Sequence, residues 1–311
     1  MVRLAQDKDF EFVKTSWKVC FSDSDKFIDW NFEKNYSKDN TLISEYNNIP
    51  ASVVQYMQYR LTVFNKSIPI RFISGVSTLP EFRNKGLVRK MLSFGLKMIY
   101  EKGAAFCTLV PAVFGMYEKF GYVTVHQRPS YINADVSGVR VEAAYDGLIE
   151  TLDKIYREHH KKTAIYIDRC RHDWELILDD LFNISEGCIL LDNADNPTAY
   201  AIIHKDNNEL CEVCGDLKFE FKEKKDAPLM ARVINAKAAL DACTEVLCEN
   251  SVFNIKDDFI EQNNKAYKIV NKKAVEVEAV GERMDISELS AYLFEKMRKN
   301  GGIGINYVME I

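Results

Sequence analysis

The sequence predicts an α+β fold built from three parts, on three observations. Apolar residues make up 47% and charged residues 28% of the 311-residue chain, which is typical of a globular protein and excludes a largely disordered one. A chain of this length usually holds two or three domains. The pattern of helical and extended segments changes near residue 133 and again at a charged stretch over 218–226, which we interpret as a linker. We therefore expect domains at 1–132, 133–226 and 227–311.

The first part begins with helices and continues as a sheet. Ser24 and its acidic neighbours can cap the second helix. From residue 41 the chain is rich in Val, Ile, Tyr and Phe between Asn-containing turns, which predicts an antiparallel meander. The predicted helices are 9–21, 25–36, 86–101 and 112–119. The predicted strands are 41–46, 52–64, 68–78, 106–110 and 122–132.

The second and third parts also mix helices with strands. In the second part, the predicted helices are 141–160 and 169–182, and the predicted strands are 187–191, 198–204 and 209–214. In the third part, the predicted helices are 235–243 and 285–297, and the strands are near 245–255, 266–270 and 274–280. An apolar tail, 305–311, follows a glycine-rich stretch and is expected to dock in a groove.

Charge and cysteine usage exclude several classes of protein. The chain has 41 basic and 46 acidic residues, a net charge of −5, so we expect no nucleic-acid partner. No segment approaches the ~18 consecutive apolar residues of a membrane span, and the charged N-terminus has no signal-peptide core. The eight cysteines are scattered along the chain, so we expect reduced thiols in a cytoplasmic protein.

The stretch 76–89 carries the strongest chemical signal. It is V-S-T-L-P-E-F-R-N-K-G-L-V-R, a strand and a turn that open directly into a helix. The unpaired N–H groups and the dipole of a helix N-terminus favour an anion, and Gly86 would let a phosphate approach the backbone closely. Arg83, Lys85 and Arg89 can add positive charge. The stretch therefore predicts a pyrophosphate cradle, although Arg83–Gly86 alone could equally be a solvated helix start.

Two motifs resemble the GCN5-related N-acetyltransferase (GNAT) superfamily: V-x-x-x-P-E-x-R-x-K-G-x-x-R from Val76 and Y-E-K-F-G-Y from Tyr117. The resemblance implies acetyl-coenzyme A (acetyl-CoA) as co-substrate, with pantetheine along the strand and pyrophosphate on the cradle. The implied contacts are Val76, Ser77, Thr78, Arg83, Asn84, Lys85, Gly86, Leu87, Val88 and Arg89. We expect no metal: Cys211 and Cys214 have zinc-like spacing, but residues three apart on a strand face opposite sides.

Nearly the whole chain resembles one branch of that superfamily, the Eis (enhanced intracellular survival) family. The matching segments are Arg83–Arg89, Met116–Tyr122, 230–235 and 285–289. The resemblance implies a GNAT domain, then a shortened and degenerate GNAT-like domain that is inert, then a sterol-carrier-protein-like α+β domain. It also implies a homo-oligomer, either a trimer or a hexamer.

The resemblance also implies roles for single residues. Tyr117 would protonate the departing thiolate of coenzyme A, which a phenol of pKa about 10 suits; core packing is the alternative. The carboxylate of Ile311 would deprotonate the amine, with His126 or a chain of waters as alternatives. An acceptor pocket is expected beside the N-terminal helices, where Trp30 and Phe32 would hold a cation by cation–π contact or merely cover the sheet.

We therefore expect an N-acetyltransferase that transfers acetyl from acetyl-CoA to a primary amine by direct attack. An aminoglycoside, a polyamine and a lysine side chain all fit as acceptors, and the sequence does not choose among them. The alternative is a non-enzymatic lipid- or acetyl-CoA-binding protein that uses the sterol-carrier-like domain.

Overall fold

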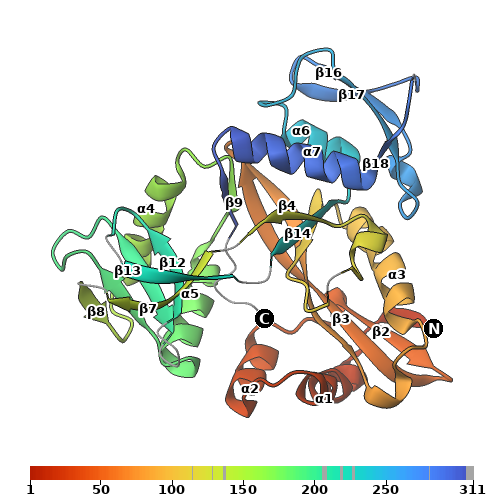
Figure 1. The fold of residues 1–311 in the computed structure, drawn as a ribbon. Coiled ribbons are helices and arrows are strands. Elements are labelled where there is room, and N and C mark those ends of the chain that lie inside the picture. Colours follow the sequence, from red (N-terminus) through yellow and green to blue (C-terminus); the bar gives the residue numbers. More distant parts are fainter. Residues whose placement is uncertain are drawn as a thin grey trace.

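The structure is a computed structural model of the chain (Figure 1). It describes residues 1–113, 115–127, 129–135, 138–204, 209–217, 220–225, 228–279 and 281–305. Within these ranges the chain forms three sheets flanked by helices, and the expected α+β class is confirmed. In the view of Figure 1, the second sheet lies to the left of the first and the third lies above it.

The first sheet is the largest. Its main path runs β1-β2-β3-β4-β5-β14-β6, and β9 pairs with both β3 and β19. The strands are β1 (Val2–Leu4), β2 (Thr41–Tyr46), β3 (Ile49–Val63), β4 (Lys66–Thr78), β5 (Phe106–Leu109), β6 (Val123–His126), β9 (Ile165–Ile167), β14 (Leu229–Val233) and β19 (Ile303–Gly304).

Segments from all three predicted parts meet in this sheet. β14, which we expected to open the third part, lies between β5 and β6 and is antiparallel to both. β9 comes from the second part and pairs with β3, while β19 comes from the end of the third part and pairs with β9. β14 and β19 therefore join the first sheet more than a hundred residues after β6.

Helices cover both faces of the first sheet. Helices α1 (Phe10–Cys20) and α2 (Asp25–Lys34) lie on one face and α3 (Leu87–Glu101) on the other. Val53 belongs to the apolar cluster under α1 and α2, whereas its neighbour Val54 belongs to the cluster under α3, because successive strand residues face opposite sides. Ser24 caps α2 as predicted, since its Oγ accepts a bond of 3.1 Å from the Phe27 amide.

The second sheet has the strand order β13-β7-β12-β11-β10-β8. Its strands are β7 (Pro129–Asp135), β8 (Val139–Val141), β10 (Cys188–Leu191), β11 (Tyr200–His204), β12 (Glu209–Cys214) and β13 (Glu220–Lys225). Helices α4 (Leu148–His160) and α5 (Arg171–Asp179) pack on one face of it around Trp174, which is 1% exposed.

The third sheet has the order β17-β16-β15-β18. Its strands are β15 (Val252–Lys256), β16 (Ala266–Val270), β17 (Lys273–Val277) and β18 (Met284–Asp285), and its helices are α6 (Ala236–Ala242) and α7 (Ile286–Lys299). α7 joins this unit to the first sheet: the rings of Phe294 and Phe106 are 5.4 Å apart in one continuous core. After α7, Ile305 is 1% exposed in that same core, and 306–311 lie outside the described residues.

Several predicted elements were wrong. The expected linker 218–226 contains β13, which pairs with β7. The expected strand 122–132 divides into β6 in the first sheet and β7 in the second, because the chain crosses between sheets there. The expected helix 112–119 is reduced to a 3-10 turn at Glu118–Phe120.

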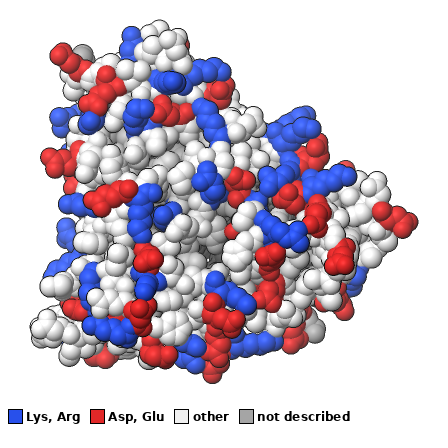
Figure 2. Space-filling model, turned by 180° about the vertical axis from the view of Figure 1, so that it is seen from behind, with Lys and Arg blue, Asp and Glu red and all other residues white. Residues whose placement is uncertain are grey.

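The outer surface mixes the two signs of charge. Figure 2 shows basic and acidic side chains interspersed over the rear face, so the described residues there form no continuous basic stripe of the kind that tracks a nucleic-acid backbone. Among the described residues, no helix combines the length and the apolar character that crossing a membrane requires.

Candidate active site

The candidate site begins where two parallel strands separate. β4 and β5 pair at Ile70–Phe106, Arg71–Cys107 and Phe72–Thr108. β4 then continues to Thr78 while β5 ends at Leu109, so the pairing given for the described residues stops six positions before the end of β4. Such a gap leaves backbone N–H and C=O groups of β4 available to a ligand.

A bulge in β4 accounts for the separation. Gln55 pairs with Ser74 and Val53 with Ser77, so Gly75 and Val76 together oppose the single residue Val54. Gly75 has φ +59°, and a Cβ there would lie 2.6 Å from the Trp17 ring, so this position requires glycine. A bulge bends the strand and increases its twist.

The alternation of β4 turns two of the predicted residues toward the gap. The Ser77 carbonyl accepts a bond of 2.6 Å from Ser52 Oγ and therefore faces β3. Carbonyls alternate along a strand, so those of Val76 and Thr78 face the β5 side. The Thr78 carbonyl also accepts from Arg83 Nε at 3.2 Å, which links the strand to the cradle.

The predicted cradle (Arg83–Arg89) is the turn that opens α3, and its role in binding phosphate stays a prediction. Asn84 has φ +60° and Gly86, the N-cap of α3, has φ +72°. A Cβ at Gly86 would meet nothing within 4 Å, so the space beside the helix N-terminus is open. The first amides of α3 have no partner within the helix. The fit to a diphosphate is therefore good in shape and in hydrogen-bond donors.

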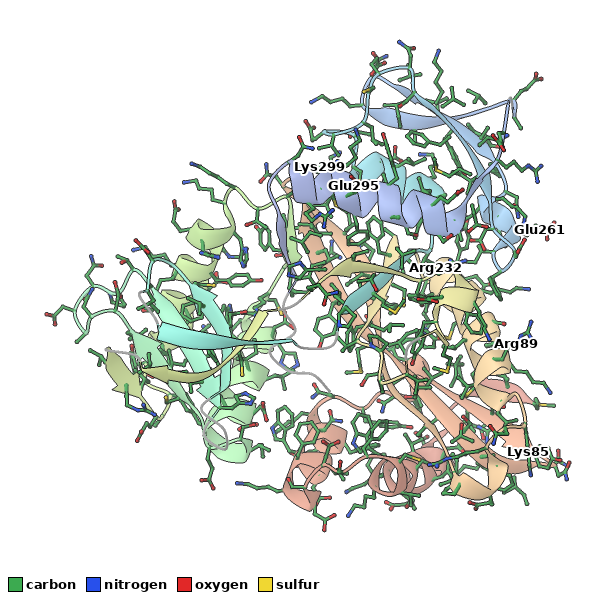
Figure 3. All side chains as sticks on the ribbon, in the orientation of Figure 1. Lys85, Arg89, Arg232, Glu261, Glu295 and Lys299 are labelled. Atoms are coloured by element: carbon green, nitrogen blue, oxygen red, sulfur yellow. The ribbon has the colours of Figure 1, made fainter. Side chains whose placement is uncertain are left out.

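Positive charge surrounds the cradle without filling it. Lys85 Nζ lies 4.2 Å from the centre of the Tyr46 ring and 5.3 Å from that of Phe82. Arg89 stands on the first turn of α3, and Figure 3 shows both Lys85 and Arg89 on the outer edge of the molecule. These side chains can swing toward an anion at little cost.

Tyr117 lies directly before the 3-10 turn and is 5% exposed. Tyr117 belongs to the apolar cluster under α3, and Val76 and Val88 pack against the same cluster, so the strand edge, the predicted cradle and the predicted acid share one core. Burial, with a smaller contribution from Cys107, raises the pKa of Tyr117 to about 12. Tyr117 therefore carries its proton throughout the neutral range, as a proton donor must.

The other predicted residues lie further from this point. His126 ends β6, opposite Leu229 of β14. Trp30 is 7% exposed and its indole N–H donates to Asp179 of the second unit at 2.7 Å. Phe32 is 3% exposed and stacks on Tyr36 with ring centres 5.8 Å apart. Both rings serve as packing, and their role in acceptor binding stays a prediction. Ile311 lies outside the described residues.

A pocket of about 180 Å³ opens on the face opposite α3. Two residues of β3 line the pocket from the first unit: Gln55, which pairs with Ser74 at the bulge, and Tyr59. The centre of the Tyr59 ring lies 6.2 Å from that of Phe72. Asp173, at the start of α5, lines it from the second unit. The pocket therefore lies beside the point where β4 and β5 separate.

Sequence reasoning missed Gly75 and the lining of the pocket. It expected an acceptor pocket beside the N-terminal helices, where Lys34 at the end of α2 lines this one, but it named Trp30 and Phe32 for that pocket. A glycine inside a strand pattern is a recognised sign of a bulge, so Gly75 could have been found. Asp173 gave no signal, because its place in the pocket with Gln55 and Tyr59 arises only in the folded chain.

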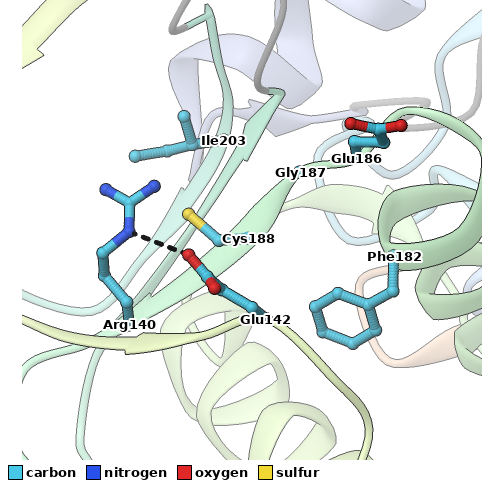
Figure 4. Close-up of a pocket in the computed structure, with 7 residues that line it drawn as sticks. All are labelled: Arg140, Glu142, Phe182, Glu186, Gly187, Cys188 and Ile203. Carbon is cyan, nitrogen blue, oxygen red and sulfur yellow. Dashed lines mark ion pairs between the residues drawn. The ribbon is translucent and has the colours of Figure 1, made fainter.

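A second pocket, of about 270 Å³, lies in the second unit (Figure 4). Arg140 and Glu142 form an ion pair of 3.6 Å at its edge, and Cys188, which is 2% exposed, lies at its floor. Its lining comes from elements of the second unit, away from β4, β5 and the cradle.

The expectation that Cys211 and Cys214 face opposite sides was wrong. Ile203 pairs with Leu210 but Ile202 pairs with Glu212, so Cys211 is an extra residue and both cysteines contact the cluster around α5.

Cys214 instead gathers with two histidines. Possible ligand atoms of His159, His160 and Cys214 lie within 4.8 Å of one another. Nδ1 of His159 accepts from the Gly215 amide at 3.1 Å, and Nδ1 of His160 is 3.2 Å from Thr163 Oγ1, so protein groups already engage both rings.

Residues 1–125 match the family model described as an acetyltransferase (GNAT) domain. This part of the chain is a GNAT domain. The GNAT domain thus includes the bulge, the cradle and Tyr117. No curated protein matches the chain in sequence.

Solved structures share the fold of nearly the whole chain. A GCN5-related N-acetyltransferase from Kribbella flavida has a TM-score of 0.73 at 12% identity, covering 99% of this chain and 100% of its own. One from Anabaena variabilis has a TM-score of 0.72 at 15% identity, covering 94% and 89%. Eis1 from Mycobacterium abscessus has a TM-score of 0.70 at 13% identity, also covering 94% and 89%. The units that follow the GNAT domain therefore belong to the same overall fold.

Proposed function

We propose that the chain is an N-acetyltransferase that moves an acetyl group from acetyl-CoA to a primary amine by direct attack. The observation that carries the proposal is the gap between β4 and β5 beside the open N-terminus of α3. A nucleotide thioester has a diphosphate for the helix end and a pantetheine arm with amide groups for the strand edge. The GNAT match over 1–125 supports the same reading.

Each part of the cradle and strand has a task. The amides at the start of α3, with Gly86 leaving room, bind the diphosphate, and Arg83, Lys85 and Arg89 add charge. Val76 and Thr78 offer backbone groups to the pantetheine amides. Bound acetyl-CoA supplies an activated acetyl thioester at the end of that arm.

The proton steps then fall to two groups. As the amine nitrogen bonds to the acetyl carbon and the carbon–sulfur bond breaks, Tyr117 gives its proton to the sulfur. The proton leaves the amine nitrogen to a base. Cys107 is 0% exposed and burial raises the pKa of its thiol to about 12, so it remains a thiol in the core rather than a nucleophile.

We propose the terminal carboxylate of Ile311 as the base, with His126 or water as the other candidates. Ile305 is 1% exposed in the apolar cluster that also contains Phe72 and Phe106. Six residues follow it, and at about 3.3–3.6 Å each an extended chain reaches about 20 Å.

The acceptor enters, in this proposal, through the pocket lined by Gln55, Tyr59 and Asp173. Asp173 offers one carboxylate to a cationic amine, such as an aminoglycoside, a polyamine or a lysine side chain, in a lining that also contains Lys34 and His172. Because Asp173 also accepts from the Cys170 amide at 2.7 Å, it is held in place by its own helix.

We further propose that the chain is Eis-like in its three parts, with domains at 1–132, 133–226 and 227–311 and a sterol-carrier-like third domain. The fold shared with Eis1 over most of both chains supports this. Assembly as a trimer or a hexamer and a cytoplasmic location belong to the same proposal.

Turnover across amine classes tests the proposed function. Release of free coenzyme A thiol would be followed with an aminoglycoside, spermidine and a lysine peptide, each in the presence of acetyl-CoA. We expect at least one class to be acetylated. If the protein binds acetyl-CoA but acetylates none of the three amine classes, the proposed acetyltransferase activity is wrong and the chain is a binding protein.

A further inference from the structure

The loop between β15 and β16, in the third unit, touches the turn that carries Tyr117. The ring of Phe259 lies 5.2 Å from that of Phe120, centre to centre. Ile260, in the same loop, is 0% exposed and belongs to the apolar cluster that contains Tyr117 and Phe120. The core around the proposed acid is therefore built in part by the third unit.

Arg232 of β14 connects this loop to the turn. Its side chain is 0% exposed and lies inside the molecule beneath α7 (Figure 3). Nε donates to the Phe120 carbonyl at 2.6 Å, Nη1 to the Val233 carbonyl at 2.7 Å, and Nη2 to Asp257 Oδ1 at 2.7 Å. All three nitrogens have acceptors, which a buried guanidinium requires.

Asp257 is fixed from the loop side. Its Oδ1 also accepts from the amides of Phe259 at 2.9 Å and Ile260 at 3.1 Å, and its Oδ2 accepts from Asn263 Nδ2 at 2.9 Å. Asn263 in turn donates to the Ile234 carbonyl at 2.7 Å. Rotation of the Asp257 carboxylate would break several buried hydrogen bonds. Its orientation is therefore fixed, and it fixes the position of the Arg232 guanidinium in turn.

The turn itself leaves little freedom. Gly121 has φ +81°, and a Cβ there would lie 2.9 Å from Ile286 Cγ2 and 3.3 Å from Arg232 Nε. The Tyr117 carbonyl accepts from the amides of Phe120 at 2.9 Å and Tyr122 at 3.3 Å. A shift of Arg232 is therefore passed through Phe120 to Tyr117 across a single tight turn.

We propose that Arg232 and Asp257 are positioning residues that hold Tyr117 in place as the proton donor. The third unit is thereby part of the acetyl-transfer machinery and not an appendage to it. This inference rests on the proposed function, in which Tyr117 is the acid.

Two variants test the inference. Asp257→Asn keeps the shape of the side chain but leaves the charge of Arg232 uncompensated, and Arg232→Lys keeps the charge but cannot bridge Phe120 and Asp257 at once. We expect kcat to fall by about 10- to 100-fold, the cost of a small misplacement. The KM for acetyl-CoA should stay unchanged, because the cradle is untouched.

The pH profile separates positioning from general damage. Burial raises the pKa of Tyr117 to about 12, which puts the alkaline limb of kcat beyond ordinary assay conditions. A loosened turn admits water, so in Asp257→Asn the limb should move down toward the ordinary phenol pKa of about 10. Asp9→Asn is the matched control: it breaks a two-point ion pair with Arg3, at 2.6 and 3.0 Å, elsewhere in the first unit. It should keep both kcat and the limb.

The outcomes are distinct. A folded Asp257→Asn with wild-type kcat and limb, alongside a Tyr117→Phe that loses activity, overturns the positioning inference alone. A fully active Tyr117→Phe overturns the acid role itself. If Asp257→Asn does not fold, Phe259→Leu removes the ring contact with Phe120 without exposing a buried charge, and the same two readouts decide.

Discussion

Two helices of this chain begin in the same way, yet we assign a cofactor to only one of them. α3 starts after Gly86 with φ +72°, and α4 starts after Gly147 with φ +88°. Each glycine is followed by a buried leucine, and at each a Cβ would meet nothing within 4 Å. A glycine in the left-handed conformation therefore begins a helix in both the first and the second unit.

The surroundings of the two helix starts differ. Basic residues surround Gly86, whereas Asp146 and Glu150 flank Gly147, so the second start repels an anion. The strand pairs of the second sheet are all antiparallel in the described residues, whereas β4 and β5 are parallel and separate beside the cradle. A left-handed glycine before a helix is thus insufficient; the site needs a parted strand pair and positive charge as well.

The largest effect should come from aspartate at the two glycines. Gly86→Asp places a carboxylate where the diphosphate would lie, opposing it by charge and by size, so binding of acetyl-CoA should fall below detection. Gly147→Asp imposes the same backbone strain in the second unit and should bind as the wild type does. Calorimetry on both variants makes the comparison. Equal loss of binding in both would show that strain, not the cradle, is responsible.

Removal of Glu310 and Ile311 should abolish turnover and leave acetyl-CoA binding intact, since it would delete the proposed base. Appending one residue moves the carboxylate by about 3.3–3.6 Å and should also impair the rate. Steady-state kinetics on both variants provide the measurement. An unchanged rate with an extended C-terminus would transfer the role to His126 or to water.

Tyr117→Phe keeps the ring and removes the proton. We expect kcat to fall by about 10²–10⁴-fold, the usual contribution of a general acid, with little change in the KM for acetyl-CoA. Tyr122→Phe, five residues along the same turn, is the control for loss of a buried hydroxyl and should stay near the wild-type rate. A two- or three-fold effect of Tyr117→Phe would return Tyr117 to a packing role.

The second unit should respond through stability instead of catalysis. Burial, and then His159, lowers the pKa of His160 to about 4. The unfolded chain, with a histidine pKa near 6.5, binds this proton first, so stability is full above about pH 6.5 and falls as pH drops toward 4. Between pH 7 and 5 the loss should be about 2 kcal/mol.

Urea unfolding at the two pH values measures that loss. His160→Phe keeps a ring to stack on Tyr166 and should remove the part of the pH dependence that comes from His160, whereas His172→Gln, at an exposed histidine, should leave it unchanged. His159, whose pKa burial also lowers, keeps its own part. If the free energy of unfolding falls by the same amount between pH 7 and pH 5 in wild type and in His160→Phe, the loss does not come from His160.

The contrast between local and distant interactions also explains what the sequence could predict. The meander was predicted correctly because alternating apolar residues act over short spans. The helix start after Gly86 follows from equally local signals, and its use as a cradle stays a prediction. Glu220–Lys225 was taken for a linker because it is charged, yet β13 is an edge strand, where charges are usual. The position of Asp173 in the pocket and the insertion of β14 between β5 and β6 depend on contacts between residues far apart in the sequence. No local sequence pattern predicts such contacts.

The Arg232–Asp257 pair shows the same limit. Neither Arg232, in the segment 230–235, nor Asp257 carries a local signal that would pair it with the other, yet the fold places their side chains 2.7 Å apart. No spacing rule connects residues whose meeting depends on the insertion of β14 between β5 and β6.

The stoichiometry of acetyl-CoA binding tests the central claim most directly. Calorimetric titration of the wild-type chain should give one site per chain, because the first unit has the parted strands and the basic cradle and the second has only the glycine. Gly86→Asp should remove that site. Two sites per chain, or one site that survives in Gly86→Asp, would contradict the account.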